Sequence, residues 1–116
     1  MEDRIKTAVE NVDGTAVIKI EGDLTAAAQE QLDADYATAI VSGASRIVIA
    51  FRETDHINSA GVGILIGLVM ECRNKDIGMR FAHPSPHFRR IFDIVGLSRY
   101  VEIFPTLEKA LVDFTH

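Results

Sequence analysis

Residues 55–67, Asp-His-Ile-Asn-Ser-Ala-Gly-Val-Gly-Ile-Leu-Ile-Gly, are the most informative segment for both the fold and the function of this chain. They follow the β-branched run of residues 46–51, which predicts a buried strand, and they lead into an uncharged stretch that predicts a helix. Asn58 and Ser59 are both good N-cap residues, so we place Ser59 at or beside the N-cap. Its hydroxyl is then expected at the surface, beside backbone N–H groups that have no partner within the helix. Such a helix end favours a negative group such as a phosphate.

Glycines follow Ser59 closely. Gly61 and Gly63 leave the first turn of the expected helix nearly bare of side chains, although each costs roughly 1 kcal/mol of helix stability relative to alanine. A bare turn would let the backbone of another protein approach Ser59. An alternative interpretation is that Ala60, Gly63 and Gly67 form a small-residue face that lets the helix lie close to the sheet. That alternative explains Gly63 and Gly67 better than Gly61.

The composition indicates one soluble globular domain spanning residues 1–116, with 47% hydrophobic and 25% charged residues. The longest uncharged apolar run has 11 residues, whereas a membrane helix needs roughly 18 or more. Residues 1–4 lack the apolar segment of a signal peptide. The single cysteine, Cys72, cannot form an internal disulfide, which fits a reducing cytoplasm. We interpret Cys72 as a small buried core residue.

The net charge of −5 is unevenly distributed. Residues 1–60 contain 5 basic and 11 acidic side chains, which gives −6, and residues 61–116 contain 7 and 6, which gives +1. Binding to a nucleic-acid backbone needs a basic surface, so the acidic first half argues against a nucleic-acid partner. A protein partner fits the charge better.

Hydrophobic periodicity and turn residues predict the element order β-β-α-β-α-β-α-β-α. The dipeptide Asp13-Gly14 predicts a tight turn within an opening hairpin. The strands are expected at residues 4–10, 15–20, 46–51, 79–82 and 101–104. The helices are expected at residues 26–42 after Thr25, at 60–74, from Pro86 to a stop at Gly96, and after Thr106. The acidic residues of the first helix, Glu30, Asp33 and Asp35, are interpreted as a solvated face.

Strands and helices alternate after the hairpin, which predicts an α/β fold with a mixed, mostly parallel sheet and helices packed against it. Function in such folds gathers where the ends of strands meet helix N-termini. Ser59 is predicted at such an end. Residues 22–25 follow another strand in the same way, which could make the two loops neighbours.

Three kinds of chemistry fit the sequence poorly. Residues 61–67 resemble a dinucleotide-binding fingerprint, but their glycines follow the strand after a loop of several residues, and residues 81–83 include no acid for a ribose. Nucleophilic catalysis by Ser59 would need an orienting base, yet no serine–glycine elbow surrounds it, and His56 is interpreted as an exposed loop residue. His83 and His87 are separated by two prolines and joined by no cysteine, which argues against a metal site. We therefore expect no catalytic residue, no metal and no cofactor.

Four segments in order make the chain resemble the STAS domain family, in particular the bacterial anti-sigma factor antagonists. They are Gly-Asp-Leu at residues 22–24, Asn-Ser-Ala-Gly-Val-Gly at 58–63, Pro-His-Phe-Arg-Arg-Ile-Phe-Asp-Ile-Val-Gly-Leu at 86–97 and Phe-Pro-Thr-Leu-Glu-Lys-Ala-Leu at 104–111. Each segment is degenerate alone, but the four together are fairly specific and cover nearly the whole chain. The resemblance implies a single STAS domain.

The resemblance also implies a partner-switching cycle. The family pattern Asp-Ser-(Ser/Thr/Ala)-Gly-(Leu/Val/Ile)-Gly places the phosphoacceptor serine on Ser59. The unphosphorylated antagonist would bind an anti-sigma factor that is itself a serine kinase, and the sigma factor would be released. Phosphorylation would end the binding, and a serine/threonine phosphatase would reset the cycle. Two positions depart from the family: Asn58 stands where the pattern has Asp, and Thr25 stands where an acid is often found.

The expected contact surface combines two loops and the first turn of the central helix. It consists of Asp23, Leu24, Thr25, Ile57, Asn58, Ser59, Ala60, Gly61 and Val62. On this interpretation the chain is a cytoplasmic, non-enzymatic monomer or weak dimer that contacts neither membrane nor nucleic acid. One alternative is a scaffold or adaptor STAS domain in a larger signalling assembly that is never phosphorylated at Ser59. Another is a ligand-binding or enzymatic role.

Overall fold

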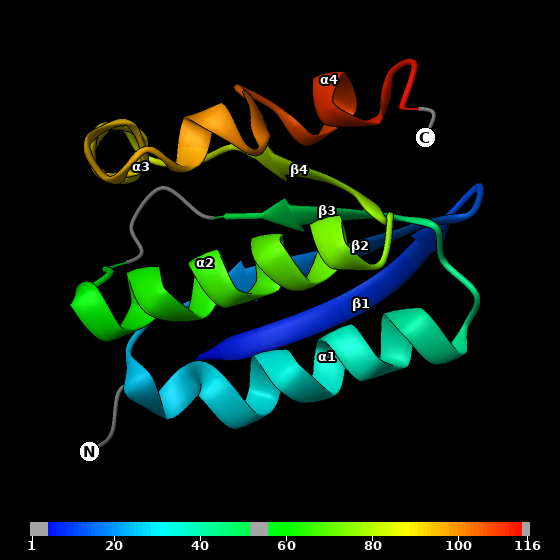
Figure 1. Cartoon of the computed structure of the whole chain (residues 1–116), viewed down its shortest axis with the longest axis horizontal. Helices are drawn as coiled ribbons and strands as arrows, with labels where there is room; N and C mark the ends of the chain where they lie inside the picture. Colours follow the sequence, from blue (N-terminus) through cyan, green and yellow to red (C-terminus); the bar gives the residue numbers. More distant parts are fainter. Residues whose placement is uncertain (1–4, 52–55, 115–116) are drawn as a thin grey trace.

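The computed structural model describes residues 5–51 and 56–114 (Figure 1). Arg4 and Asp55, which entered the sequence analysis, lie outside these ranges. The strands are β1 (Lys6–Val12), β2 (Thr15–Glu21), β3 (Arg46–Ala50), β4 (Gly78–Ala82) and β5 (Glu102–Phe104). The helices are α1 (Gln29–Val41), α2 (Ser59–Asn74), α3 (Pro86–Val95) and α4 (Leu107–Leu111), with short 3-10 turns η1 (Ala26–Ala28) and η2 (Leu97–Arg99).

The five strands form one mixed sheet in the order β1-β2-β3-β4-β5. β1 is antiparallel to β2, and every later neighbouring pair is parallel. The opening hairpin turns at Asp13 and Gly14, whose φ angles of 52° and 86° both lie in the left-handed region that tight hairpin turns require. The element order and the mostly parallel sheet confirm the predicted α/β fold.

Side chains alternate between the two faces of the sheet, and a different set of helices covers each face. Figure 1 shows α1 and α2 lying together on one side of the sheet. The larger core lies on that side, where Ile47 and Ile49 of β3 join Leu65 of α2. Val48, which points to the opposite face, packs with Ala110 of α4 in a second and smaller core. The buried side of α2 therefore packs against this face of the sheet.

Four phenylalanines fix α3 near the ends of β3 and β4. Phe51 lies with its ring centroid 5.2 Å from that of Phe81 and 5.7 Å from that of Phe88, and Phe92 lies 5.3 Å from Phe81. The Ser85 hydroxyl accepts a hydrogen bond from the Phe88 N–H at 3.0 Å, which caps the start of the helix. This cluster buries the apolar side of α3.

One expectation about α1 is wrong. Asp35 was predicted on a solvated face, but its exposed fraction is 6%. It is buried together with Leu32 and Ala39, which lie three and four residues away on the same side of the helix, and α1 packs against β1. The Gln31 side-chain amide donates to the Asp35 carboxylate at 3.1 Å, which offsets part of the cost of burying that carboxylate.

Candidate partner-binding site

Asn58, and not Ser59, caps the N-terminus of α2. Asn58 has the extended backbone of an N-cap (φ −116°, ψ −177°), and its side-chain oxygen accepts a hydrogen bond from the Gly61 N–H at 2.9 Å. Its carbonyl accepts the first helical hydrogen bond, from the Val62 N–H at 3.0 Å. Ser59 is therefore the first residue of the helix, beside the cap, and its side chain has no part in the capping bond.

The surroundings of Ser59 suit an added anion. Ser59 and Ala60 are both exposed, and within the described ranges no acceptor bonds their backbone N–H groups. These donors stand at the positive end of the α2 dipole. A phosphate carried on the Ser59 hydroxyl would lie beside them without displacing the Asn58 cap.

The two loops suspected of being neighbours are joined by the backbone. The Leu24 N–H donates to the His56 carbonyl at 2.6 Å, and the Asn58 N–H donates to the Leu24 carbonyl at 3.3 Å. Leu24 and Ile57 thereby form an isolated parallel bridge. The loop after β2 and the entrance to α2 consequently form one continuous surface.

The predicted contact residues divide into an outer and an inner group. Asn58, Ser59 and Ala60 are exposed, and Asp23, Thr25 and Val62 are half-buried. The inner group, Leu24, Ile57 and Gly61, is buried. The side chains of Leu24 and Ile57 are buried beneath this surface, and Gly61 has no side chain, so none of the three can offer a side chain to a partner. Thr25 has a further local role, because its hydroxyl accepts from the Ala27 N–H at 3.3 Å and caps η1.

The glycines of α2 have two different roles. A Cβ on Gly61 would overlap the Leu24 carbonyl oxygen and lie 2.7 Å from its carbon, so glycine is needed for α2 to approach this loop. A Cβ on Gly63 or Gly67 would meet nothing within 4 Å. The alternative interpretation of a small-residue face packed on the sheet is therefore wrong, since Gly63 and Gly67 are exposed and make no close contact with the sheet.

Cys72 lies on the buried side of α2 with an exposed fraction of 0%, as predicted. Burial is the main cause that raises the pKa of its thiol to about 12, and the neighbouring Glu71 carboxylate adds to the shift. The thiol is neutral at physiological pH, so this cysteine is a core residue and not a nucleophile.

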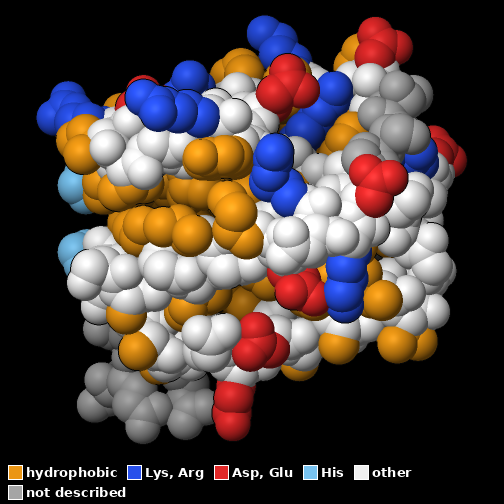
Figure 2. All heavy atoms as spheres, in the orientation of Figure 1, with side chains coloured by type: hydrophobic (Ala, Val, Ile, Leu, Met, Phe, Trp, Pro, Cys, Tyr) orange, Lys and Arg blue, Asp and Glu red, His pale blue; other side chains and the backbone are white. Residues whose placement is uncertain are grey.

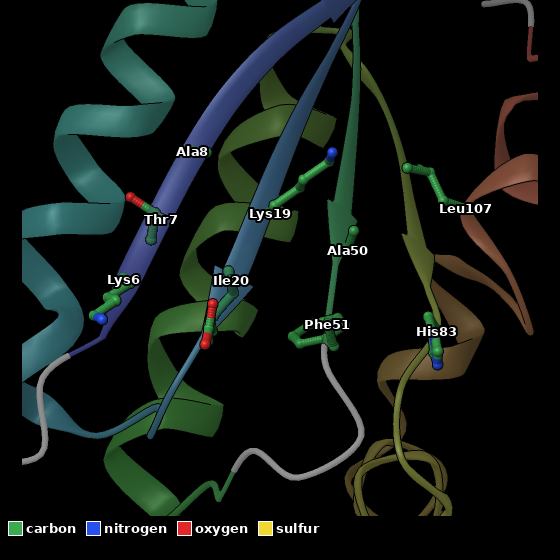
Figure 3. Close-up of a pocket in the computed structure, with 10 residues that line it drawn as sticks. Lys6, Thr7, Ala8, Lys19, Ile20, Ala50, Phe51, His83 and Leu107 are labelled. Atoms are coloured by element: carbon green, nitrogen blue, oxygen red, sulfur yellow. The ribbon is translucent and has the colours of Figure 1, made fainter.

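A cavity that the sequence did not predict lies on the sheet beside α4 (Figure 3). Its volume is about 320 Å³, and Lys19, Ala50, His83 and Leu107 are among the residues that line it. Lys19 forms an ion pair with Glu10 at 2.8 Å, and both side chains are about half exposed. The cavity shares no lining residue with the surface around Ser59.

Two general features of the described residues bear on function. None of the helices in residues 5–51 and 56–114 is both long enough and apolar enough to cross a membrane. Within the same ranges, no three metal-ligating side chains gather closely enough to hold an ion.

Comparison with known proteins identifies the family. The STAS domain profile matches residues 6–110, so the chain belongs to the STAS domain family. The anti-sigma F factor antagonist of Lysinibacillus sphaericus is 31% identical over 88 residues, covering 75% of each chain. The anti-sigma factor antagonist SpoIIAA in its unphosphorylated form is 32% identical, with a TM-score of 0.73 over 91% of this chain and 93% of the other. The phosphorylated form of SpoIIAA, a Bacillus cell fate determinant, is 30% identical, with a TM-score of 0.67 over 91% and 96%.

Proposed function

We propose that this chain is an anti-sigma factor antagonist whose binding to a serine-kinase anti-sigma factor is switched by phosphorylation of Ser59. The unphosphorylated chain binds the anti-sigma factor, and the sigma factor is released. The observation that carries the proposal is that the exposed Ser59 is the first residue of α2, while the Asn58 side chain forms the cap. The likeness to SpoIIAA, which has been solved in both unphosphorylated and phosphorylated forms, supports it.

Phosphorylation would act on the interface and not on the fold. A phosphoserine adds about −1.5 to −2 charges and three acceptor oxygens. The amides of Ser59 and Ala60 can receive them, so the modified helix end stays favourable. A partner packed closely on the bare first turn would instead meet new bulk and charge. Binding therefore ends without unfolding.

Asn58 is compatible with this switch. An amide oxygen and a carboxylate oxygen can both accept the Gly61 N–H, so either residue type can cap α2. The neutral Asn58 side chain does not repel a phosphate on Ser59. We propose that the partner kinase recognises the serine through the surrounding surface and does not require a carboxylate at this position.

The rest of the cycle follows the same proposal. A serine/threonine phosphatase restores Ser59, and the chain itself catalyses no reaction and uses no cofactor. It acts in the cytoplasm as a single STAS domain, as a monomer or a weak dimer. The contact surface is the pair of bridged loops, residues 23–25 and 57–58, with the first turn of α2 from Ser59 to Val62.

The test uses each purified anti-sigma factor of the same organism, with and without ATP. We expect one of them to bind the wild type and to add one phosphate, located on Ser59 by intact mass and site mapping. Ser59→Asp should weaken binding at least tenfold. Ser45→Asp is the control, because Ser45 is also exposed but precedes β3 at the opposite end of that strand. Equal binding by the wild type and Ser59→Asp would contradict the proposal, and a stable, unphosphorylated high-order oligomer would favour the scaffold alternative.

A further inference from the structure

The outer face of α2 is unusual for a helix at a protein surface. Residues 59–70 include no charged side chain, although the helix is covered by the protein on one side only. We give the name α2 strip to six residues on this face: Ser59, Val62, Gly63, Ile66, Gly67 and Met70. Val62 and Met70 are half-buried and pack against the core, and the other four are exposed. Helices of soluble proteins normally turn charged and polar residues outward. Exposed apolar side chains that gather beside such a face are typical of an interaction site.

Among the described residues, no close contact requires glycine at the exposed positions of the strip. Gly63 and Gly67 lie within α2, and a Cβ added to either residue would have no neighbouring atom within 4 Å. Glycine weakens a helix relative to alanine, so the fold would gain from alanine at both positions. What glycine provides here is space above the helix, and that space serves a molecule from outside.

The strip is hollowed toward α1. A cavity of about 390 Å³ lies between the two helices, with Gln29, Asp33 and Tyr36 on the α1 side and Gly63 and Gly67 on the α2 side. The two glycines thus form part of the wall of a groove that follows α2. Because Gly63 is one turn from Ser59, the groove continues the surface around the proposed phosphoacceptor.

Toward α3 the strip becomes more hydrophobic. Figure 2 shows hydrophobic side chains gathered over the adjoining sides of α2 and α3. Ile66 is 37% exposed, and Ile94 and Val95 of α3 are 75% and 45% exposed. At the far end the Arg73 guanidinium lies 5.2 Å from the centre of the half-exposed Tyr100 ring and closes this side of the strip.

The two sides of the strip differ in their exposed charges, apart from two ion pairs: Lys75 with Glu71 beside Tyr36 of α1, and Arg89 with Asp93 on α3. Glu30 and Asp33 are exposed on α1, whereas Arg90 of α3, Arg99 of η2 and Arg73 near the end of α2 are exposed on the other side. Figure 2 shows basic side chains over α3 and acidic ones over the start of α1. A partner that lies along α2 therefore meets a basic border and an acidic border in fixed positions.

We propose that the α2 strip docks an amphipathic helix of the anti-sigma factor, with an apolar contact face, acidic residues toward α3 and basic residues toward α1. This inference rests on the proposed function and extends its interface beyond the first turn of α2. The opposite borders set the direction in which the partner helix lies. A second copy of this chain fits less well, because two copies with a net charge of −5 each repel one another.

The first experiment separates binding from stability. Isothermal titration of each purified anti-sigma factor of the same organism is compared for the wild type and for the double variant Gly63→Ala, Gly67→Ala. We expect the double variant to unfold at a higher temperature and yet to bind the anti-sigma factor at least tenfold more weakly. A larger side chain, Gly67→Gln, should weaken binding further. Ala34→Gln, on the exposed side of α1 away from the groove, is the control and should bind as the wild type.

The second experiment tests the borders. Glu30→Lys and Arg90→Glu should each weaken binding at least tenfold. The matched controls Glu108→Lys and Lys109→Glu make the same changes in net charge on α4, which covers the other face of the sheet, and they should have no effect.

The outcomes are distinct. If Ser59→Asp abolishes binding but the strip and border variants bind as the wild type, the docking inference is wrong and the proposed function stands. If no anti-sigma factor binds the wild type, both are wrong. If sedimentation shows a dimer of this chain that Gly67→Gln disrupts, the strip is a contact between copies and the docking inference is overturned.

Discussion

Gly61 and Gly63 are separated by one residue and have opposite surroundings. At Gly61 the backbone of α2 reaches the Leu24 carbonyl, and no side chain fits between them. At Gly63 there is open space. The same residue type thus lets α2 pack against its own chain at one position and leaves room above the helix at the other.

The two positions predict opposite effects of the same substitution. Gly61→Ala should lower the free energy of unfolding by about 1–3 kcal/mol, because the new methyl group forces the Leu24 loop away from α2. Gly63→Ala should raise it by about 0.5–1 kcal/mol, because alanine favours the helix and meets no neighbour. Urea unfolding of both variants measures the difference. Changes of the same sign would contradict the assigned surroundings.

The Cys72 thiol gives a prediction about pH. Its pKa is raised from 9.0 to about 12 in the folded protein, so between these values the unfolded chain loses the thiol proton and the folded chain keeps it. The free energy of unfolding should therefore fall as pH rises from about 9 to about 12. Cys72→Ala should show a shallower fall, because this contribution is missing. Parallel curves for the two proteins would show that the thiol does not stay neutral in the folded state.

At the scale of elements, the start of α2 depends on one side chain. Asn58→Ala should lower the free energy of unfolding by about 1 kcal/mol, because the Gly61 N–H loses its acceptor. Asn58→Asp keeps an acceptor oxygen and should remain close to the wild type. Thermal unfolding of the two variants distinguishes the cap from a simple loss of a polar surface residue. Equal losses in both would contradict the assignment of the cap.

Element boundaries could be predicted because their signals are local. Thr25 and Thr106 start η1 and α4 with side-chain caps, and Gly43 and Gly96 stop their helices with φ angles of 85° and 83°. Each of these residues acts through its nearest neighbours in the chain. Strand β1 spans Lys6–Val12, so it begins and ends two residues later than the predicted residues 4–10. Both ends are set by pairing with β2, from Glu21 to Thr15.

The orientation of helices could not be predicted in the same way. Asp35 is buried because α1 turns this side toward β1, and the sequence of α1 alone does not contain that information. α2 is apolar nearly all round, so its periodicity does not say which side meets the sheet. For that reason the sequence leaves open whether Gly63 and Gly67 face the sheet. The position of Ser59 was predictable, since the cap signal around it is local.

At the scale of the whole molecule, the phenylalanine cluster links the sheet to α3. Phe92 is fully buried and lies within 6.0 Å of three other rings, measured between centroids. Phe92→Ala should lower the free energy of unfolding by about 3–5 kcal/mol, because it removes these contacts and leaves a cavity. Denaturant unfolding followed by circular dichroism measures the loss. Phe92→Leu should lose less, and equal losses would argue against a packed aromatic cluster.

The larger architecture followed from the alternation of strands and helices, but the surface that we propose for a partner could not be predicted from it. The α2 strip is assembled from one side of a helix and bordered by α1 and α3, which are distant in sequence. Only the folded arrangement brings Glu30 and Arg90 to opposite borders of the same surface. The sequence shows only that acidic residues are in excess in the first half of the chain. The fold places one of them, Glu30, on the α1 side of the α2 strip and the basic Arg90 on the α3 side.

Because the Asn58 side chain caps the beginning of α2, no hydrogen bond shown within residues 5–51 and 56–114 depends on the Ser59 side chain. A residue with that freedom can be altered and restored again and again while the molecule stays intact. Under the proposed function, the fraction of copies phosphorylated on Ser59 would set how much anti-sigma factor is bound. That fraction could be reversed without new protein synthesis and without degradation.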